Sequence, residues 1–223
     1  MNEFDIKKLL DTPIEAFDFQ FMIGHVKDFL EFSEKNIDRQ YRRELQAITY
    51  RKDSDENLPP EYRDHLEQNL THRFKVSLPL CARYGALLSF TTSVEWAVTL
   101  LNNRSKSPAP KKEIKDKTNL TVYMLRHLSS CACVDLRSLM DDYEALVHIR
   151  NCIVHSAGVV STSIFKKDLH DAVARIEGIL IGNWHYFGDH ICIKRDALES
   201  PINQTALLVV ELHTKMEEQG LLK

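Results

Sequence analysis

A chain of 223 residues is long enough for one large domain, or for one domain with an extension, and leaves little room for two independent enzymes. Apolar residues make up 43% and charged residues 27%, the balance of a water-soluble globular protein, so we do not expect a disordered chain. The formal net charge of −3 argues against a uniformly basic nucleic-acid-binding coat, but a local basic patch is compatible with it.

The composition favours helices over strands. Only seven glycines and seven prolines supply tight turns, whereas Leu, Glu, Lys, Arg and Ala are abundant, so we expect a mainly α fold. No signal peptide is recognisable, and no run of about 18 apolar residues occurs, so we expect a cytoplasmic protein without a membrane segment. Five cysteines, an odd number, indicate free thiols rather than a disulfide framework.

The first third of the chain predicts one long helix and a break. The tetrapeptide Thr12-Pro13-Ile14-Glu15 is typical of a helix start, with a capping hydroxyl, a proline in the first turn and a carboxylate that can reach back. We expect this helix to run to about Tyr50, with a bend near Gly24. The stretch 51–60, RKDSDENLPP, is polar and ends in two prolines, so it predicts a connection.

A second helical stretch begins at Glu61 and continues to about Asn103, with a kink expected at Pro79. The following segment, NNRSKSPAPKK, predicts a surface loop. From Arg104 to Lys117 six basic residues stand against two acidic ones. This excess leaves two interpretations open, a solvated loop or an edge that attracts phosphate groups.

The remaining chain predicts three helices and then a change of pattern. They are expected at about 120–130, at 136–156 with Asp135 as cap and Gly158 as stop, and from the hydroxyl-rich 161–163 to about Leu180.

Aromatic and β-branched residues on both sides of Gly188-Asp189 then indicate a short β-hairpin with its turn at these two residues. A final helix is expected over about 197–219.

The helix at 136–156 carries the most informative pattern. At 100° per residue, Arg150 falls near the centre of a broad apolar face. A guanidinium cannot stay unpaired among apolar groups, so Arg150 must meet a carboxylate, open onto a cleft or lie at a subunit interface. A polar ridge runs beside it: Glu144, His148, Asn151 and His155. The apolar face itself comprises Leu136, Leu139, Met140, Tyr143, Leu146, Val147, Ile149, Ile153 and Val154.

Arginine and histidine together suit the cleavage of a phosphodiester. Arginine binds phosphate oxygens while it remains charged, and histidine is the side chain best suited to move protons near neutral pH. In RNA the 2′-hydroxyl is an internal nucleophile, so a base or acid and a cation suffice without metal. A two-fold dimer with this helix at its interface would bring two histidines and two arginines to one groove.

The segment Arg150-Asn151-Cys152-Ile153-Val154-His155, on an apolar-periodic helix and followed by Ser-Ala-Gly, resembles the Arg-x4-6-His motif of the HEPN superfamily. In that family the residue after the arginine is typically polar, and a long helix precedes the motif helix within a helical bundle. The resemblance covers residues 76–223, which are expected to form one compact bundle with a short hairpin near the C-terminus. Residues 1–75 would be an added helical extension.

The resemblance implies a metal-independent endoribonuclease that acts as a homodimer on RNA, commonly a toxin or defence effector opposed by an antitoxin or regulatory protein. Arg150 and His155 would be catalytic, with Asn151 supporting them, and no cofactor or metal is implied. The alternative is a non-catalytic HEPN-like module that dimerises or binds RNA or protein through the same face. One departure concerns position 157, an alanine where toxins of nucleotidyltransferase pairs have a tyrosine, so regulation by modification of that tyrosine is not expected.

Three further residues are candidates for support. Glu95 is the only charged residue between Arg83 and Arg104, so it is either a carboxylate partner for Arg150 or His155 or part of a mild polar face. His148 and Glu144 precede the motif on the polar ridge. The histidines and cysteines elsewhere lack the paired spacing of a zinc site, so we expect no metal.

Overall fold

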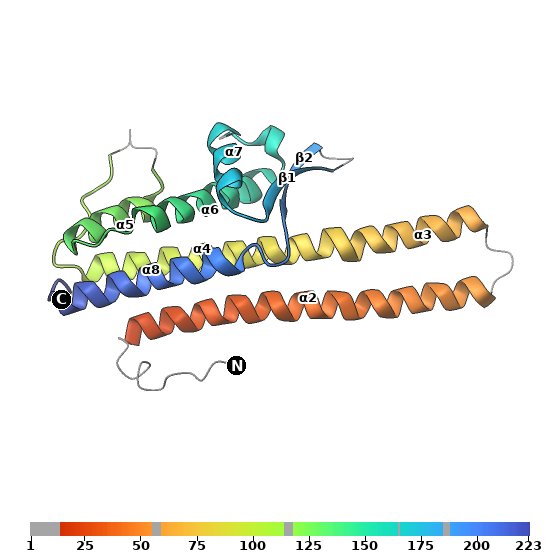
Figure 1. Cartoon of the computed structure of the whole chain (residues 1–223), viewed down its shortest axis with the longest axis horizontal. Coiled ribbons are helices and arrows are strands. Elements are labelled where there is room, and N and C mark those ends of the chain that lie inside the picture. Colours follow the sequence, from red (N-terminus) through yellow and green to blue (C-terminus); the bar gives the residue numbers. More distant parts are fainter. Residues whose placement is uncertain (1–13, 55–58, 114–117, 165, 185–187) are drawn as a thin grey trace.

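The computed structural model describes residues 14–54, 59–113, 118–164, 166–184 and 188–223. The fold is mainly α with one short antiparallel hairpin near the C-terminus, as the composition and the residue patterns predicted. Figure 1 shows a long helical pair, with the remaining helices and the hairpin stacked along one half of it.

The long pair consists of α2 (Ile14–Ser54) and a helical rod that returns beside it, built from α3 (Pro60–His72) and α4 (Leu78–Arg104). The predicted cap at Thr12 and Pro13 lies outside the described residues. The predicted break is confirmed at residue 59, but the helix continues four residues beyond Tyr50. α2 is continuous across Gly24, where a bend was expected.

The rod accommodates Pro79 by a local change of helix type. A π-helical turn, Arg73–Ser77, precedes α4, and the backbone N–H of Leu78 bonds the carbonyl of Arg73. A wider turn relocates the hydrogen bonds just before the proline, which itself has no N–H to donate. The rod therefore runs from α3 into α4 across residue 75, where the N-terminal extension was expected to end.

Three shorter helices, α5 (Leu120–Cys131), α6 (Arg137–Ser156) and α7 (Lys166–Arg175), follow the loop after α4. Asn119 caps α5, because its side chain accepts the backbone N–H groups of Thr121 at 2.9 Å and Val122 at 3.3 Å.

The prediction that the third of these helices extends to Leu180 is wrong, because α7 ends at Arg175. Gly178 adopts a φ of +80°, and a β-carbon there would lie 2.8 Å from the β-carbon of Ala197. The chain reverses at this glycine, and the β-branched residues after it form strand β1 (Ile179–Trp184).

Strand β2 (Gly188–Ile193) pairs antiparallel with β1, from Ile179 opposite Ile193 to Trp184 opposite Gly188. The hairpin is confirmed, but the turn was predicted two residues late. Gly188 and Asp189 both belong to β2, and the connection falls at 185–187, outside the described residues. The final helix, α8 (Glu199–Glu218), packs on α2, α4 and α6.

One continuous apolar core joins the long helices to the shorter ones. It includes Phe19 and Ile23 from α2, Phe90 from α4, Ile149 from α6 and Leu212 from α8. The motif helix is therefore fixed by neighbours on several sides. None of the described helices is both long and apolar enough to cross a membrane.

An ionic cluster around the buried carboxylate of Glu34 also ties α2 to the rest of the fold. The carboxylate of Glu34 accepts from Nε of Arg83 at 2.7 Å and pairs with Nε of Arg195 at 2.8 Å. Arg83 Nη1 also donates to the carbonyl of Ile193 at 2.8 Å. Because both oxygens of the buried carboxylate meet cations, the cluster fixes the position of α2 against α4 and the end of β2.

Candidate functional site

The motif helix α6 buries the predicted apolar face over most of its length. Tyr143, Leu146 and Ile149 are fully buried. The prediction is wrong for Val154, whose side chain is 47% exposed. Val154 lies on the same side of the helix as Tyr143 and Val147, so this side leaves the core after Val147 and its last turn meets solvent.

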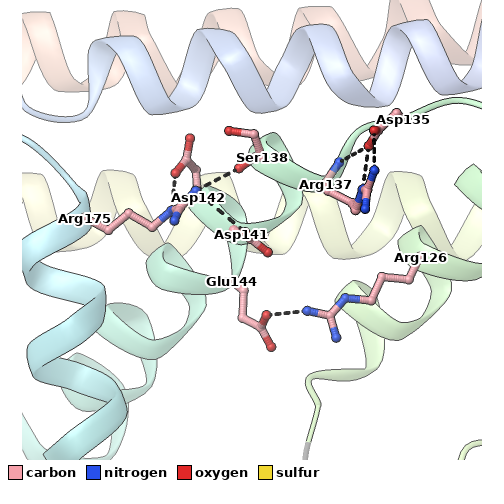
Figure 2. Close-up of polar contacts among 8 residues, drawn as sticks. All are labelled: Arg126, Asp135, Arg137, Ser138, Asp141, Asp142, Glu144 and Arg175. Carbon is pink, nitrogen blue, oxygen red and sulfur yellow. Dashed lines mark hydrogen bonds and ion pairs between the residues drawn. The ribbon is translucent and has the colours of Figure 1, made fainter.

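Asp135 acts at the start of α6, but one residue before the cap position. Its carboxylate accepts the backbone N–H of Arg137 at 3.2 Å and the guanidinium of Arg137 at 2.7 and 3.0 Å (Figure 2). The hydrogen bond from the Arg137 side chain is the main cause that lowers the pKa of Asp135 to about 2. Leu136 is the cap itself, since its carbonyl accepts the N–H of Met140 at 2.9 Å.

Arg150 lies next to the side of α6 that leaves the core after Val147, while Cys152 and Ile153 beyond it are still buried. Its side chain is half-buried, and Nη1 donates to Oδ1 of Asn151 at 3.0 Å. Nε is buried and has no hydrogen-bond partner among the described residues. Within the described chain no carboxylate pairs with Arg150 within 4 Å, so of the three arrangements expected for this arginine, an internal carboxylate pair does not occur. A guanidinium with unused donors suits an anionic ligand.

The charges of Arg150 on α6 and of Glu95 on α4 both act on the pKa of the Tyr143 hydroxyl. Burial is the main cause that raises the pKa of Tyr143, and the charge of half-buried Glu95 raises it further. The Thr121 side chain and the positive charge of Arg150 act in the opposite direction, while the Tyr143 hydroxyl itself has no hydrogen-bond partner among the described residues. Glu95 and Arg150 thus lie near the same phenol without contacting each other directly, and Tyr143 is a core residue, as expected.

The predicted polar ridge is accessible along its length. Glu144, His148 and Asn151 are half-buried, and His155 is exposed. Arg150 and His155 are five residues apart, which places them about 7.5 Å apart along the axis and about 140° apart around it. Their side chains therefore leave α6 in different directions, and Asn151 lies between those directions.

Most carboxylates on the first half of α6 are engaged by neighbouring arginines, as Figure 2 shows. Glu144 pairs with Nη2 of Arg126 on α5 at 2.7 Å. Asp142 pairs with Nε of Arg175 on α7 at 2.5 Å, and Asp141 lies 3.8 Å from the same guanidinium. Glu144 is thus directed toward α5, which accounts for its position on the ridge without a role beside Arg150.

The end of α6, which carries His155, is held by a contact that the sequence did not predict. Ala157 has a φ of +50° and Gly158 a φ of +83°, so Ala157 is the first residue to leave the helical conformation, where we expected Gly158. The hydroxyl of Tyr84 on α4 donates to the carbonyl of Ile191 at 2.5 Å, and its ring covers Gly158. The backbone N–H of Ile191 bonds the carbonyl of Gly158 at 2.9 Å.

The sequence predicted Gly158 as the helix stop, whereas nothing in the sequence around Tyr84 indicated that its side chain would pack on Gly158. Tyr84 is therefore a positioning residue for the end of the motif helix, found only from the structure.

The basic loop after α4 is anchored to the C-terminus at its start. The N–H of Lys106 bonds the carbonyl of Leu221 at 2.8 Å, and Lys106 Nζ donates to the carbonyl of Gly220 at 2.6 Å. Ser105 is buried, so the expected loop has an ordered first part. Lys115 and Lys117 lie outside the described residues.

Among the described residues, His, Cys, Asp and Glu side chains form no group of three that could hold a metal ion. His127 lies 3.5 Å from Sγ of Cys131, and the same ring nitrogen lies 3.0 Å from the carbonyl of Ser107. The two residues are one turn apart on α5, so ordinary helix geometry brings them together.

Comparison of the chain with protein-family models, with curated proteins and with solved structures finds no match.

Proposed function

We propose that the protein is a metal-independent endoribonuclease of the HEPN type, acting as a homodimer. The observation that carries this proposal is Arg150: its Nε is buried without a hydrogen-bond partner among the described residues, while Asn151 orients its Nη1. The half-buried guanidinium has no carboxylate partner among the described residues, so its charge is available to a phosphate that approaches from solvent. His155 follows on the same helix and is open to solvent, so it can exchange protons with a substrate.

The proposed reaction uses the ribose 2′-hydroxyl as nucleophile. One histidine removes the proton of this hydroxyl as its oxygen forms a bond to phosphorus. Arg150 stabilises the charge that develops on the phosphoryl oxygens. The bond from phosphorus to the 5′-oxygen breaks, and a second histidine donates a proton to this leaving oxygen. The products are a 2′,3′-cyclic phosphate and a 5′-hydroxyl.

Two copies of the chain supply these groups better than one. Arg150 and His155 leave α6 in directions about 140° apart, and one chain has only one histidine in the motif. A two-fold axis near the end of α6 would place both histidines and both arginines around a single substrate. The exposed Val154 between Arg150 and His155 is compatible with such an interface.

The biological role as a toxin or defence effector in the cytoplasm, opposed by an antitoxin or regulatory protein, is proposed from the family resemblance of RNCIVH. The alternative function is a non-catalytic module that uses the same face to dimerise or to bind RNA or protein. Val154 also favours this alternative, because an exposed valine beside the motif would serve either a groove or a docking face.

The test is cleavage of a labelled RNA in EDTA by the wild-type protein and by variants. We expect His155→Ala to lower the rate by about 10²- to 10⁴-fold and Arg150→Ala by at least about 10²-fold. Glu144→Gln is the matched control, because this ridge residue is directed toward Arg126, and it should retain the wild-type rate.

An RNA with 2′-O-methyl groups should resist cleavage. RNA binding without cleavage by the wild-type dimer would instead establish the binding module.

A further inference from the structure

The exposed side of α2 carries an aromatic stripe. Phe21, Phe29 and Phe32 are 59%, 48% and 69% exposed, and they fall within about 80° of one another on the helix. His25 lies within the same arc, with its ring 4.2 Å from that of Phe21, and exposed Asp28 lies about 20° outside the arc. Large aromatic side chains gathered on one side of a surface helix usually mark an interaction site.

The adjoining side of α4 is uncharged. Its solvent-facing residues between Arg83 and Arg104 are small or polar, with Trp96 as the one large side chain, 43% exposed. Glu95, half-buried, is the only charge in this interval and lies at the edge toward Arg150. A solvated helix face normally carries Lys, Arg, Asp or Glu, so the lack of charge over about five turns needs an explanation. The exposed residues in this interval are Ser89, Thr92, Trp96, Thr99 and Asn103.

The stripe on α2 and the uncharged side of α4 form one surface. The two helices lie side by side along the length concerned (Figure 1). A β-carbon on Gly85 of α4 would contact the ring of Phe29 at 3.7 Å, and Phe19 of α2 and Trp96 of α4 line a common hollow. We call this surface, made of the three phenylalanines of the stripe and the uncharged side of α4, the α2–α4 surface.

We propose that the α2–α4 surface is where a second copy of this chain binds, so that the N-terminal helical extension supplies much of the dimer interface. The physical argument for this interface does not depend on the proposed function. Its consequence, a site shared by two chains, does rest on the proposed function. Glu95 connects the surface to the site, because its charge acts on Tyr143 beside Arg150. A partner seated on α4 would thus approach Arg150 from the side of Glu95.

Charge and area favour a second copy over other occupants. The α4 side has no cations for a nucleic acid and no charges for a strongly charged protein, whereas two copies of an uncharged face meet without repulsion. An aromatic side chain can bury roughly 150–250 Å², so three phenylalanines and one tryptophan at these exposures offer about 400 Å². This is about half of the ~800 Å² that each partner contributes to a typical stable interface, and the remaining α4 side adds to it.

The test is the mass of the purified full-length chain by analytical ultracentrifugation. We expect the wild-type protein to sediment as a dimer of 25.8-kDa chains at micromolar concentration. Phe32→Ser and Trp96→Ser should each raise the dimer dissociation constant on the order of 100-fold. Leu207→Ser is the matched control, since Leu207 is 65% exposed on α8, and it should leave the dimer intact. Circular dichroism melts establish that each variant is folded.

Three results would overturn the assignment. The first is a monomeric wild-type protein at about 100 µM. The second is a monomer that begins to associate once residues 1–13 are deleted, because the chain's own N-terminal segment would then be the occupant. The third is a dimer that survives both aromatic variants, which would place the interface away from the α2–α4 surface.

Failure of this inference and failure of the nuclease are distinguishable, because mass and RNA cleavage are measured on the same samples. A dimer that dissociates as predicted but never cleaves RNA retains the interface and loses the nuclease. A monomer that cleaves RNA in EDTA retains the cleavage activity but loses both the interface and the homodimer of the proposed function.

Discussion

Replacing Gly158 by alanine should be among the most damaging single changes near the motif. The added β-carbon would lie 2.4 Å from the hydroxyl oxygen and 3.0 Å from Cζ of Tyr84, so the ring must move. Its displacement would also break the hydrogen bond to the carbonyl of Ile191. Besides, alanine is strained at the φ of +83° that Gly158 adopts.

The expected cost is a sum of three contributions. A left-handed alanine costs about 1–2 kcal/mol, forced repacking about 1–3 kcal/mol and the lost hydrogen bond about 1 kcal/mol. We therefore expect Gly158→Ala to lower the free energy of unfolding by about 3–6 kcal/mol, a large share of the stability of an ordinary domain. Urea denaturation followed by circular dichroism measures this difference.

Two further variants separate the contributions. Tyr84→Phe removes the oxygen at 2.4 Å, so the double variant with Gly158→Ala should be about 1–2 kcal/mol more stable than additivity predicts. Ala157→Gly relieves the adjacent φ of +50° and should stabilise the protein by up to about 1 kcal/mol. A loss below about 1 kcal/mol for Gly158→Ala, or strict additivity in the double variant, would refute the reasoning.

Three more predictions follow from the polar groups. Glu34→Gln leaves the largely buried Arg83 without its charged partner, whereas Arg195, 58% exposed, can meet solvent, so the free energy of unfolding should fall by about 2–3 kcal/mol in urea titrations; a fall under 1 kcal/mol would contradict a buried Glu34–Arg83 pair. Burial raises the pKa of Tyr143 above its unfolded value near 10, so its contribution is intact below pH 10 and is lost above it, by up to about 1.4 kcal/mol per pH unit. Urea titrations of Tyr143→Phe between pH 9 and 11 should show a shallower decline than the wild type, and an equal decline would count against this cause. Glu144→Gln removes a partly exposed ion pair and should change the melting temperature by no more than a few degrees, whereas a large drop would mean that the pair is stronger than its exposure implies.

The sequence predicted the motif helix well because its signals are local. Apolar periodicity located α6 to within one residue at its start, and it correctly buried Tyr143 and Leu146. The same periodicity could not predict where the core ends along the helix axis, so it wrongly placed Val154 among the buried residues. The extent of burial depends on which neighbours continue beside the helix, and this is a property of the tertiary fold.

The other differences have similar causes. Helical propensity extended the helix before β1 to Leu180, whereas the left-handed conformation of Gly178 and its contact with Ala197 end it. The contact of Tyr84 with Gly158 joins residues 74 positions apart in the chain, and no local pattern carries such information. The candidate site was predictable as a set of residues on α6, while the state of Arg150, with an unused buried donor, required the fold.

The most direct test of the central claim is incubation of a mixed RNA pool in EDTA with the wild-type protein and with its His155→Ala variant, followed by analysis of the product ends. The account predicts wild-type cleavage to 2′,3′-cyclic phosphate ends and at least a 10²-fold slower reaction for the variant. Equal rates for the two proteins, or no cleavage by a folded wild-type dimer, would contradict a ribonuclease site at Arg150 and His155.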